Sequence, residues 1–85
     1  MKYQHFGQRS RAVINYIIEF ESAHGVPPSG EDIASGCGIA RTYAYDLLRR
    51  MEEEGLIERT RIDGRTVGRN LRLTKAAMKA MKETL

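Results

Sequence analysis

Apolar residues in the first quarter of the chain recur at the three- and four-residue spacing of an α-helix. Over residues 11–23 they form a stripe wider than a helix needs to contact a single neighbour, and Ser10 precedes it as a candidate N-cap. The pattern predicts a helix whose apolar face consists of Val13, Ile14, Tyr16, Ile17, Ile18 and Phe20.

Residues 31–48 contain the pattern of two short helices joined by a tight turn. Gly38 stands at the turn, where a residue without a Cβ adopts a positive φ at little cost. Ala34 in the first helix is small enough to let the two helices cross closely, and Ile39 plugs the space between them. The second helix has an apolar face of Ala44, Leu47, Leu48 and Met51. This spacing predicts a helix-turn-helix.

Local signals set the limits of these helices. The segment Gly25-Val26-Pro27-Pro28 ends the first helix and keeps the chain extended, because a residue before proline avoids the α region. Ser29 and Asp32 fit a capping box, which starts a second helix running to about Ser35. The third helix is expected at about 40–54, with Gly55 as its C-terminal stop.

The pattern then changes to that of a β-hairpin. Residues 56–62 and 66–73 are strand candidates, and Asp63-Gly64 between them is a strong hairpin signal. Two registers remain open. A two-residue turn pairs Leu56 with Leu71 and Glu58 with Arg69, whereas a three-residue turn with a bulge pairs Ile57 with Leu71 and Arg59 with Arg69.

The end of the chain returns to helical spacing. Thr74 is a candidate cap for a helix over residues 75–85, with Ala77, Met78, Met81 and Leu85 on one face. At the other end, residues 1–8 have no periodicity and are expected to form an arm. The chain therefore divides into this arm and one domain over residues 9–85.

Charge is unevenly distributed. The net charge is only +3. Residues 1–58 carry six Lys and Arg against nine Asp and Glu, whereas residues 59–85 carry eight against two. Five of the basic residues are arginines of the hairpin: Arg59, Arg61, Arg65, Arg69 and Arg72. A basic surface at one end of a fold is typical of a protein that faces phosphate groups.

Several classes of protein are disfavoured. No apolar run approaches the length of a membrane helix or of a signal peptide. The single cysteine, Cys37, excludes an internal disulfide, so a cytoplasmic, nucleoid-associated location is expected. His5 and His24 are isolated, and no nucleophile, base and orienting group occur together. We therefore expect no metal, no cofactor and no enzymatic activity, and we assign Cys37 to the core.

Three helices, a hairpin and a closing helix make a winged helix-turn-helix, an α+β fold that is mostly α: a three-helix bundle, a two-stranded β-hairpin wing and a short C-terminal helix. The combination Gly25-x-Pro27-Pro28-Ser29, Ile33-Ala34…Gly38-Ile39, Leu47 through Gly55-Leu56-Ile57 and Arg69-x-Leu71-Arg72-Leu73 resembles the DNA-binding domain of LexA-type repressors. The segment Asp63-Gly64-Arg65…Leu73-Thr74 is similar to the wing and following helix of MarR-type regulators.

This resemblance implies a sequence-specific regulator of transcription that binds double-stranded DNA. Its recognition helix, about 40–54, would enter the major groove, and the arginine-rich wing, 59–72, would lie on the backbone or in the minor groove. The loop before the third helix is one residue shorter than in LexA-type repressors. No protease or effector domain is expected to follow, so self-cleavage and induction by a small molecule do not carry over.

The candidate DNA-binding residues lie in three places. The side of the third helix opposite its apolar face offers arginine, threonine and tyrosine side chains, which suit base edges and phosphates. The hairpin arginines suit phosphates, and Ser29 stands at the start of the second helix. The full set is Ser29, Arg41, Thr42, Tyr45, Asp46, Arg49, Arg59, Arg61, Arg65 and Arg69. An alternative for the helix face is a solvated surface with an Asp46–Arg49 ion pair.

Two further interpretations stay open. A plasmid or phage replication or partition protein uses the same fold on DNA, and a winged helix can also serve purely as a protein-interaction module.

The wide apolar face of the first helix and the apolar stripe of the last helix favour a homodimer over complete burial within one chain. The residues expected at the dimer interface are Ile14, Ile18, Met78, Met81 and Leu85.

Overall fold

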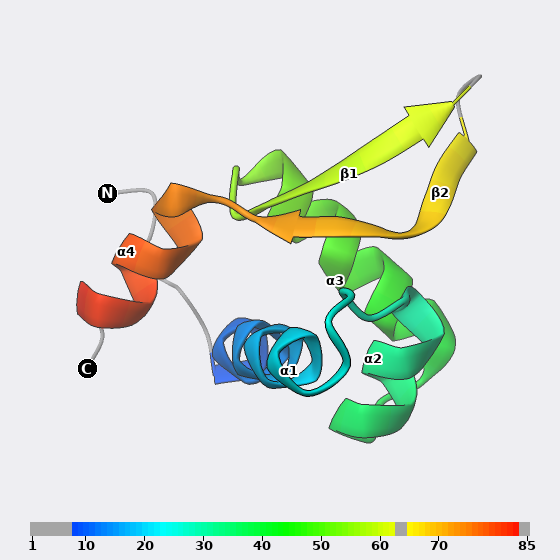
Figure 1. Cartoon of the computed structure of the whole chain (residues 1–85), viewed down its shortest axis with the longest axis horizontal. Helices are drawn as coiled ribbons and strands as arrows, with labels where there is room; N and C mark the ends of the chain where they lie inside the picture. The colour runs from blue at the N-terminus through cyan, green and yellow to red at the C-terminus, as the bar shows by residue number, and fades with distance from the viewer. Residues whose placement is uncertain (1–7, 63–64, 84–85) are drawn as a thin grey trace.

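The structure is a computed structural model. It describes the backbone of residues 8–62 and 65–83 and the side chains of residues 8–59 and 71–82. The elements follow in the order α1 (Gln8–His24), α2 (Gly30–Cys37), α3 (Arg41–Glu53), β1 (Ile57–Ile62), β2 (Arg65–Leu73) and α4 (Lys75–Glu83). The first three helices pack together, the hairpin projects past α3, and α4 lies at the base of the hairpin, away from its tip (Figure 1). The predicted winged helix-turn-helix architecture is confirmed.

The first helix begins three residues earlier than the sequence pattern indicates. Because α1 starts at Gln8, Ser10 lies inside its first turn, and the prediction that Ser10 caps the helix is wrong. The predicted arm lies outside the described residues apart from Gln8. The apolar face is placed as expected, with Val13, Ile14 and Ile17 buried.

The helix-turn-helix is confirmed in detail. Ser29 Oγ accepts a hydrogen bond from the Asp32 amide at 3.1 Å, and the Asp32 carboxylate accepts one from the Ser29 amide at 3.0 Å. This capping box satisfies two amides at the start of α2, which extends to Cys37, two residues past the expected end. Gly38 then adopts the left-handed conformation, with φ at 67°, and turns the chain into α3.

The third helix presents the predicted face to the interior. Ala44, Leu47, Leu48 and Met51 are all buried. The helix ends at Glu53, and Gly55 follows with a positive φ, as its place after the helix predicted. The side opposite this buried face is therefore available to contact another molecule.

The hairpin is antiparallel, but neither predicted register is correct over its whole length. Near the tip, Ile62 pairs with Arg65, which fits a two-residue turn. At the base, Ile57 pairs with Leu73 and Arg59 with Leu71, so the expected partners of Leu56, Ile57, Glu58 and Arg59 are wrong. An irregularity between Arg59 and Arg61 separates the two registers, because β2 carries more residues than β1 over that stretch.

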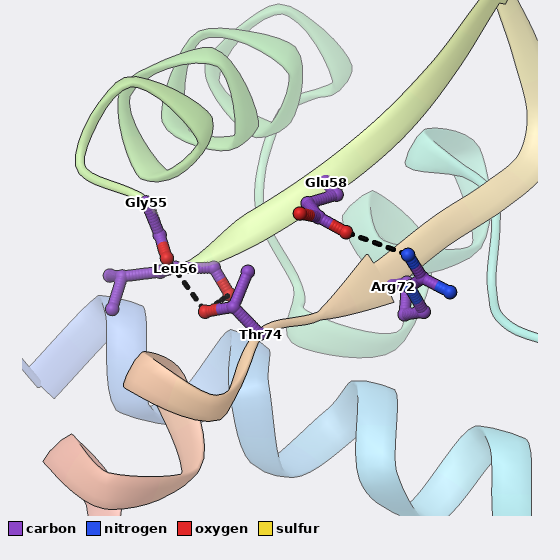
Figure 2. Close-up of polar contacts among 5 residues, drawn as sticks. All are labelled: Gly55, Leu56, Glu58, Arg72 and Thr74. Atoms are coloured by element: carbon purple, nitrogen blue, oxygen red, sulfur yellow. Dashed lines mark hydrogen bonds and ion pairs between the residues drawn. The ribbon is translucent and has the colours of Figure 1, made fainter.

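Thr74 fastens the last helix to the rest of the domain. Its hydroxyl oxygen accepts a hydrogen bond from the Ala77 amide at 3.2 Å, which caps α4 as predicted. The same hydroxyl group lies 2.6 Å from the carbonyl oxygen of Gly55 and 3.1 Å from that of Leu56, which are acceptors at the α3–β1 turn (Figure 2). The Thr74 side chain therefore joins two segments that are far apart in the sequence.

The face that α4 buries differs from the predicted one. Ala77 and Ala80 are buried and Met81 packs against the core, but Met78 is 43% exposed. Leu85 lies outside the described residues. Ile14 is completely buried within the chain, so in this fold it has no surface left for the dimer interface in which it was placed.

One continuous core joins the helices to the base of the hairpin. Among the described residues no helix combines the length and apolar character that would let it cross a membrane. The buried apolar residues that form this contiguous core are Val13, Ile14, Ile17, Ile33, Ala34, Ala44, Leu47, Leu48, Met51, Leu56, Ile57, Leu71 and Ala77, with Tyr16, Ile18, Cys37, Ile39, Leu73 and Met81 packed against them.

Candidate nucleic-acid interface

A hollow of about 410 Å³ lies between the outer face of α3 and strand β1. Its described lining consists of five of the ten candidate DNA-binding residues, Thr42, Tyr45, Asp46, Arg49 and Arg59. The four from α3 share one side of the helix because they follow its 3.6-residue period, and Arg59 comes from the neighbouring strand. The fold thus brings hydroxyl groups, a carboxylate and guanidinium groups together around one concave surface.

Ion pairs hold several of these side chains on the surface of α3. Asp46 Oδ1 lies 2.6 Å from a guanidinium nitrogen of Arg49, and Asp46 Oδ2 lies 3.3 Å from one of Arg50. All three side chains are substantially exposed, and exposed pairs of this kind contribute about 0–1 kcal/mol. Both arginines can therefore exchange the carboxylate for a phosphate or a base at little cost. Arg50 was not among the predicted residues.

Arg41 lies at the start of α3 and pairs with Glu31 of α2 at 3.1 Å. Both side chains are about two-thirds exposed, so Arg41 also remains accessible. Ser29, by contrast, uses its hydroxyl group in the capping box. Its observed contribution is to begin α2, and this sets the position of the helix on which α3 packs.

Arg59 differs from the exposed arginines. Its side chain is only 11% exposed, and a terminal nitrogen lies 3.4 Å from the Glu52 carboxylate on α3. Its Nε is buried and has no hydrogen-bond partner among the described residues. The strand alternation explains this placement, because Arg59 follows the buried Ile57 by two residues and so points to the same face of β1.

The remaining wing arginines are defined to different degrees. Arg61 lies in β1, and Arg65 and Arg69 lie in β2, but their side chains fall outside the described part of the chain. Arg72 is 80% exposed and donates to Glu58 at 2.8 Å across the hairpin (Figure 2). This pair also belongs to a second hollow at the base of the hairpin.

The residues that the structure describes contain no group of three or more His, Cys, Asp or Glu side chains arranged to hold a metal ion. Burial raises the pKa of the Cys37 thiol, which disfavours the reactive thiolate. Cys37 packs against the core, as the sequence predicted.

Comparison with known proteins agrees with this fold. No protein-family model matches the chain. A stretch of 67 residues is 42% identical to a LexA repressor from Roseiflexus sp. strain RS-1. The match covers 76% of this chain and 28% of the repressor, so the chain spans less than a third of that relative. The resemblance to LexA-type repressors is confirmed over this stretch.

A solved structure has the same arrangement of elements. A point mutant of MepR from S. aureus, a MarR-family protein, superposes with a TM-score of 0.73 at 21% sequence identity. The match covers 96% of this chain and 59% of that one. At this identity the likeness establishes the fold, including the wing and the closing helix.

Proposed function

We propose that this winged helix-turn-helix chain is a sequence-specific regulator of transcription that binds double-stranded DNA and acts as a repressor. In this proposal α3 enters the major groove and the hairpin lies along the backbone or in the minor groove. The observation that carries it is the hollow between α3 and β1, where Thr42, Tyr45 and Arg49 face one concave surface.

The chemistry of this surface suits DNA better than a protein partner. Arginine pairs with guanine O6 and N7, and threonine and tyrosine bond base edges or phosphates. Arg41, Arg49 and Arg50 are held only by exposed ion pairs, which DNA can replace. The repressor role rests on the similarity to the LexA repressor from Roseiflexus sp..

The proposal is tested by selecting bound sites from a random duplex library. We expect enrichment of one sequence, and a specific affinity that exceeds the affinity for random duplex by about 10³-fold or more. Equal recovery of all sequences would contradict sequence-specific regulation. A complete lack of binding to any duplex at low salt would instead favour a protein-interaction module.

The homodimer stays part of the proposal in a reduced form. With Ile14 buried, the described residues left to contact a second copy are the exposed Met78 and the partly buried Ile18 and Met81. A two-fold partner would place two α3 helices on half-sites about one helical turn apart. Sedimentation at micromolar concentration should show a species of twice 9.6 kDa, and a 9.6 kDa species would exclude the dimer.

A further inference from the structure

Arg59 is the described wing arginine that points into the fold instead of outward. It lies on the wall shared by the two hollows, since it lines both the one beside α3 and the one at the base of the hairpin. On one side of that wall are Tyr45 and Asp46 of the proposed DNA surface. On the other are Glu58 and Arg72 of the hairpin.

The ion-pair partner of Arg59 is Glu52, which was not among the candidate functional residues of the sequence. Glu52 belongs to an acidic run at the end of α3, and its side chain is only 20% exposed. Its carboxylate pairs with the Arg59 guanidinium at 3.4 Å, so the contact joins the recognition helix directly to the wing. The neighbouring Glu53 is exposed and has no ion pair within the described part of the chain.

The location of this pair matters because of how the wing is supported. Leu56, Ile57 and Leu71 anchor the base of the hairpin in the core. A two-stranded hairpin is only marginally stable by itself, so the part beyond these residues needs another contact to keep one orientation. The Arg59–Glu52 pair lies at the point where β1 leaves the core.

We infer that Arg59 is a positioning residue, which holds the wing at a fixed angle to α3 through Glu52 rather than contacting DNA itself. This inference rests on the proposed function for its consequence, which is that the wing and α3 reach the duplex together. Its largely buried side chain leaves little of the guanidinium for a phosphate. Glu52 thereby acquires a role in DNA binding, although its charge repels DNA.

Whether Glu52→Gln tightens or weakens DNA binding tests the positioning role of the Arg59–Glu52 pair. Removing an acid raises the net charge, which by electrostatics alone tightens binding to any duplex. If the pair positions the wing, Glu52→Gln weakens binding to the selected site by about tenfold. The slope of log K against log salt also becomes shallower by about one. A wing that no longer keeps one orientation makes, on average, about one phosphate contact fewer. Glu53→Gln is the matched control and should only tighten binding slightly.

Exchanging the two charges provides a second test. Glu52→Arg and Arg59→Glu each place like charges together and should each weaken specific binding, whereas the double variant restores an ion pair with the net charge unchanged. The double variant should bind the selected site more tightly than either single variant. If the double variant bound the selected site no more tightly than the single variants, or if its loss of affinity equalled the sum of the two single losses, the inference would be overturned. Either result would show that the two residues act independently.

A measurement without DNA separates this inference from the proposed function. Trypsin should cleave within residues 59–72 faster in Glu52→Gln than in Glu53→Gln, at a temperature where both variants are folded by circular dichroism. Equal cleavage rates, together with equal tightening of DNA binding by both variants, would overturn the positioning role. If the unmodified protein binds no DNA, the proposed function fails, and the cleavage rates alone decide whether the pair holds the wing.

Discussion

The ring of Tyr45 on α3 lies directly over Gly30, the first residue of α2. A Cβ built on Gly30 would be 2.7 Å from Cζ of that ring, a separation that real Cβ atoms essentially never show. The absent side chain at Gly30 is therefore what allows the Tyr45 ring to rest on the start of α2. Tyr45 remains 43% exposed, so it contacts the start of α2 on one side and is accessible to another molecule on the other.

Gly30→Ala should displace the Tyr45 ring and weaken binding to the selected site. The loss is expected to be about tenfold, within the 1–3 kcal/mol of a good base contact. The same substitution in a Tyr45→Ala background should have no such effect, because the clash is gone, and alanine also suits a helix better than glycine. A loss of equal size in both backgrounds, measured by titration with fluorescent duplex, would contradict this role of Tyr45.

Leu47→Ala should destabilise the whole domain. Leu47 is buried where α3 packs on α2, so its truncation removes apolar contacts and leaves a cavity. The expected loss is about 2–5 kcal/mol of unfolding free energy, which is a large part of the stability of a domain of this size. Chemical denaturation measures it. A midpoint equal to that of the unmodified protein would mean that α3 is rotated from its observed position.

Arg65→Ala should weaken binding to all duplexes by a similar factor. Arg65 begins β2 next to the turn of the hairpin. In the proposed binding mode, a residue at this place would contact phosphates or the minor groove, which offer few base edges that distinguish one sequence from another. The slope of log K against log salt should fall by about one. Arg49→Ala is the contrasting variant, and it should reduce binding to the selected site much more than binding to random duplex. The reverse pattern would assign sequence reading to the wing.

Asp46→Asn should relax the preference for one base pair. The Asp46 carboxylate either accepts from a cytosine amino group or orients Arg49, which it contacts at 2.6 Å. In both cases the substitution alters selectivity at one position of the site. If Asp46 were merely a repulsive charge, Asp46→Asn would tighten binding to all sequences equally. Repeating the site selection with the variant distinguishes these results.

Thr74→Val should loosen α4 without unfolding the three-helix core. The substitution keeps the shape of the side chain but removes the cap of the Ala77 amide and the hydrogen bonds to Gly55 and Leu56. The expected cost is about 1–3 kcal/mol. Amide hydrogen exchange should become faster in α4 and stay slow in α3, and uniform acceleration would show that α4 unfolds together with the core.

The helical core could be predicted because burial requires apolar residues at the helical period. Ala44, Leu47 and Met51 specify one face of α3, and the opposite face with Tyr45 and Arg49 follows from the same geometry. The start of α1 could not be predicted, since Ser10 is compatible both with a cap and with a first turn.

The hairpin shows more clearly how far the structure can be predicted from the sequence. Asp63-Gly64 fixes the pairing next to the turn, but it carries no information on an irregularity farther along the strands. The pairing of Ile57 with Leu73 depends on the extra length of β2 and on how the base of the hairpin fits the core. The composition of the hairpin groups all five arginines into one basic set and does not by itself distinguish the largely buried Arg59 from the others. Strand alternation from Ile57 could have separated it.

The irregular pairing of β2 also affects how the protein behaves at high concentration. A projecting two-stranded hairpin exposes backbone donors and acceptors along its outer edge, and a long regular edge would template the addition of strands from other molecules. In β2 the regular pairing is divided into a short run beside the turn and another from Leu71 to Leu73. A strand from a second molecule cannot follow both runs in a single register. The change of register therefore disfavours edge-to-edge aggregation of the wing.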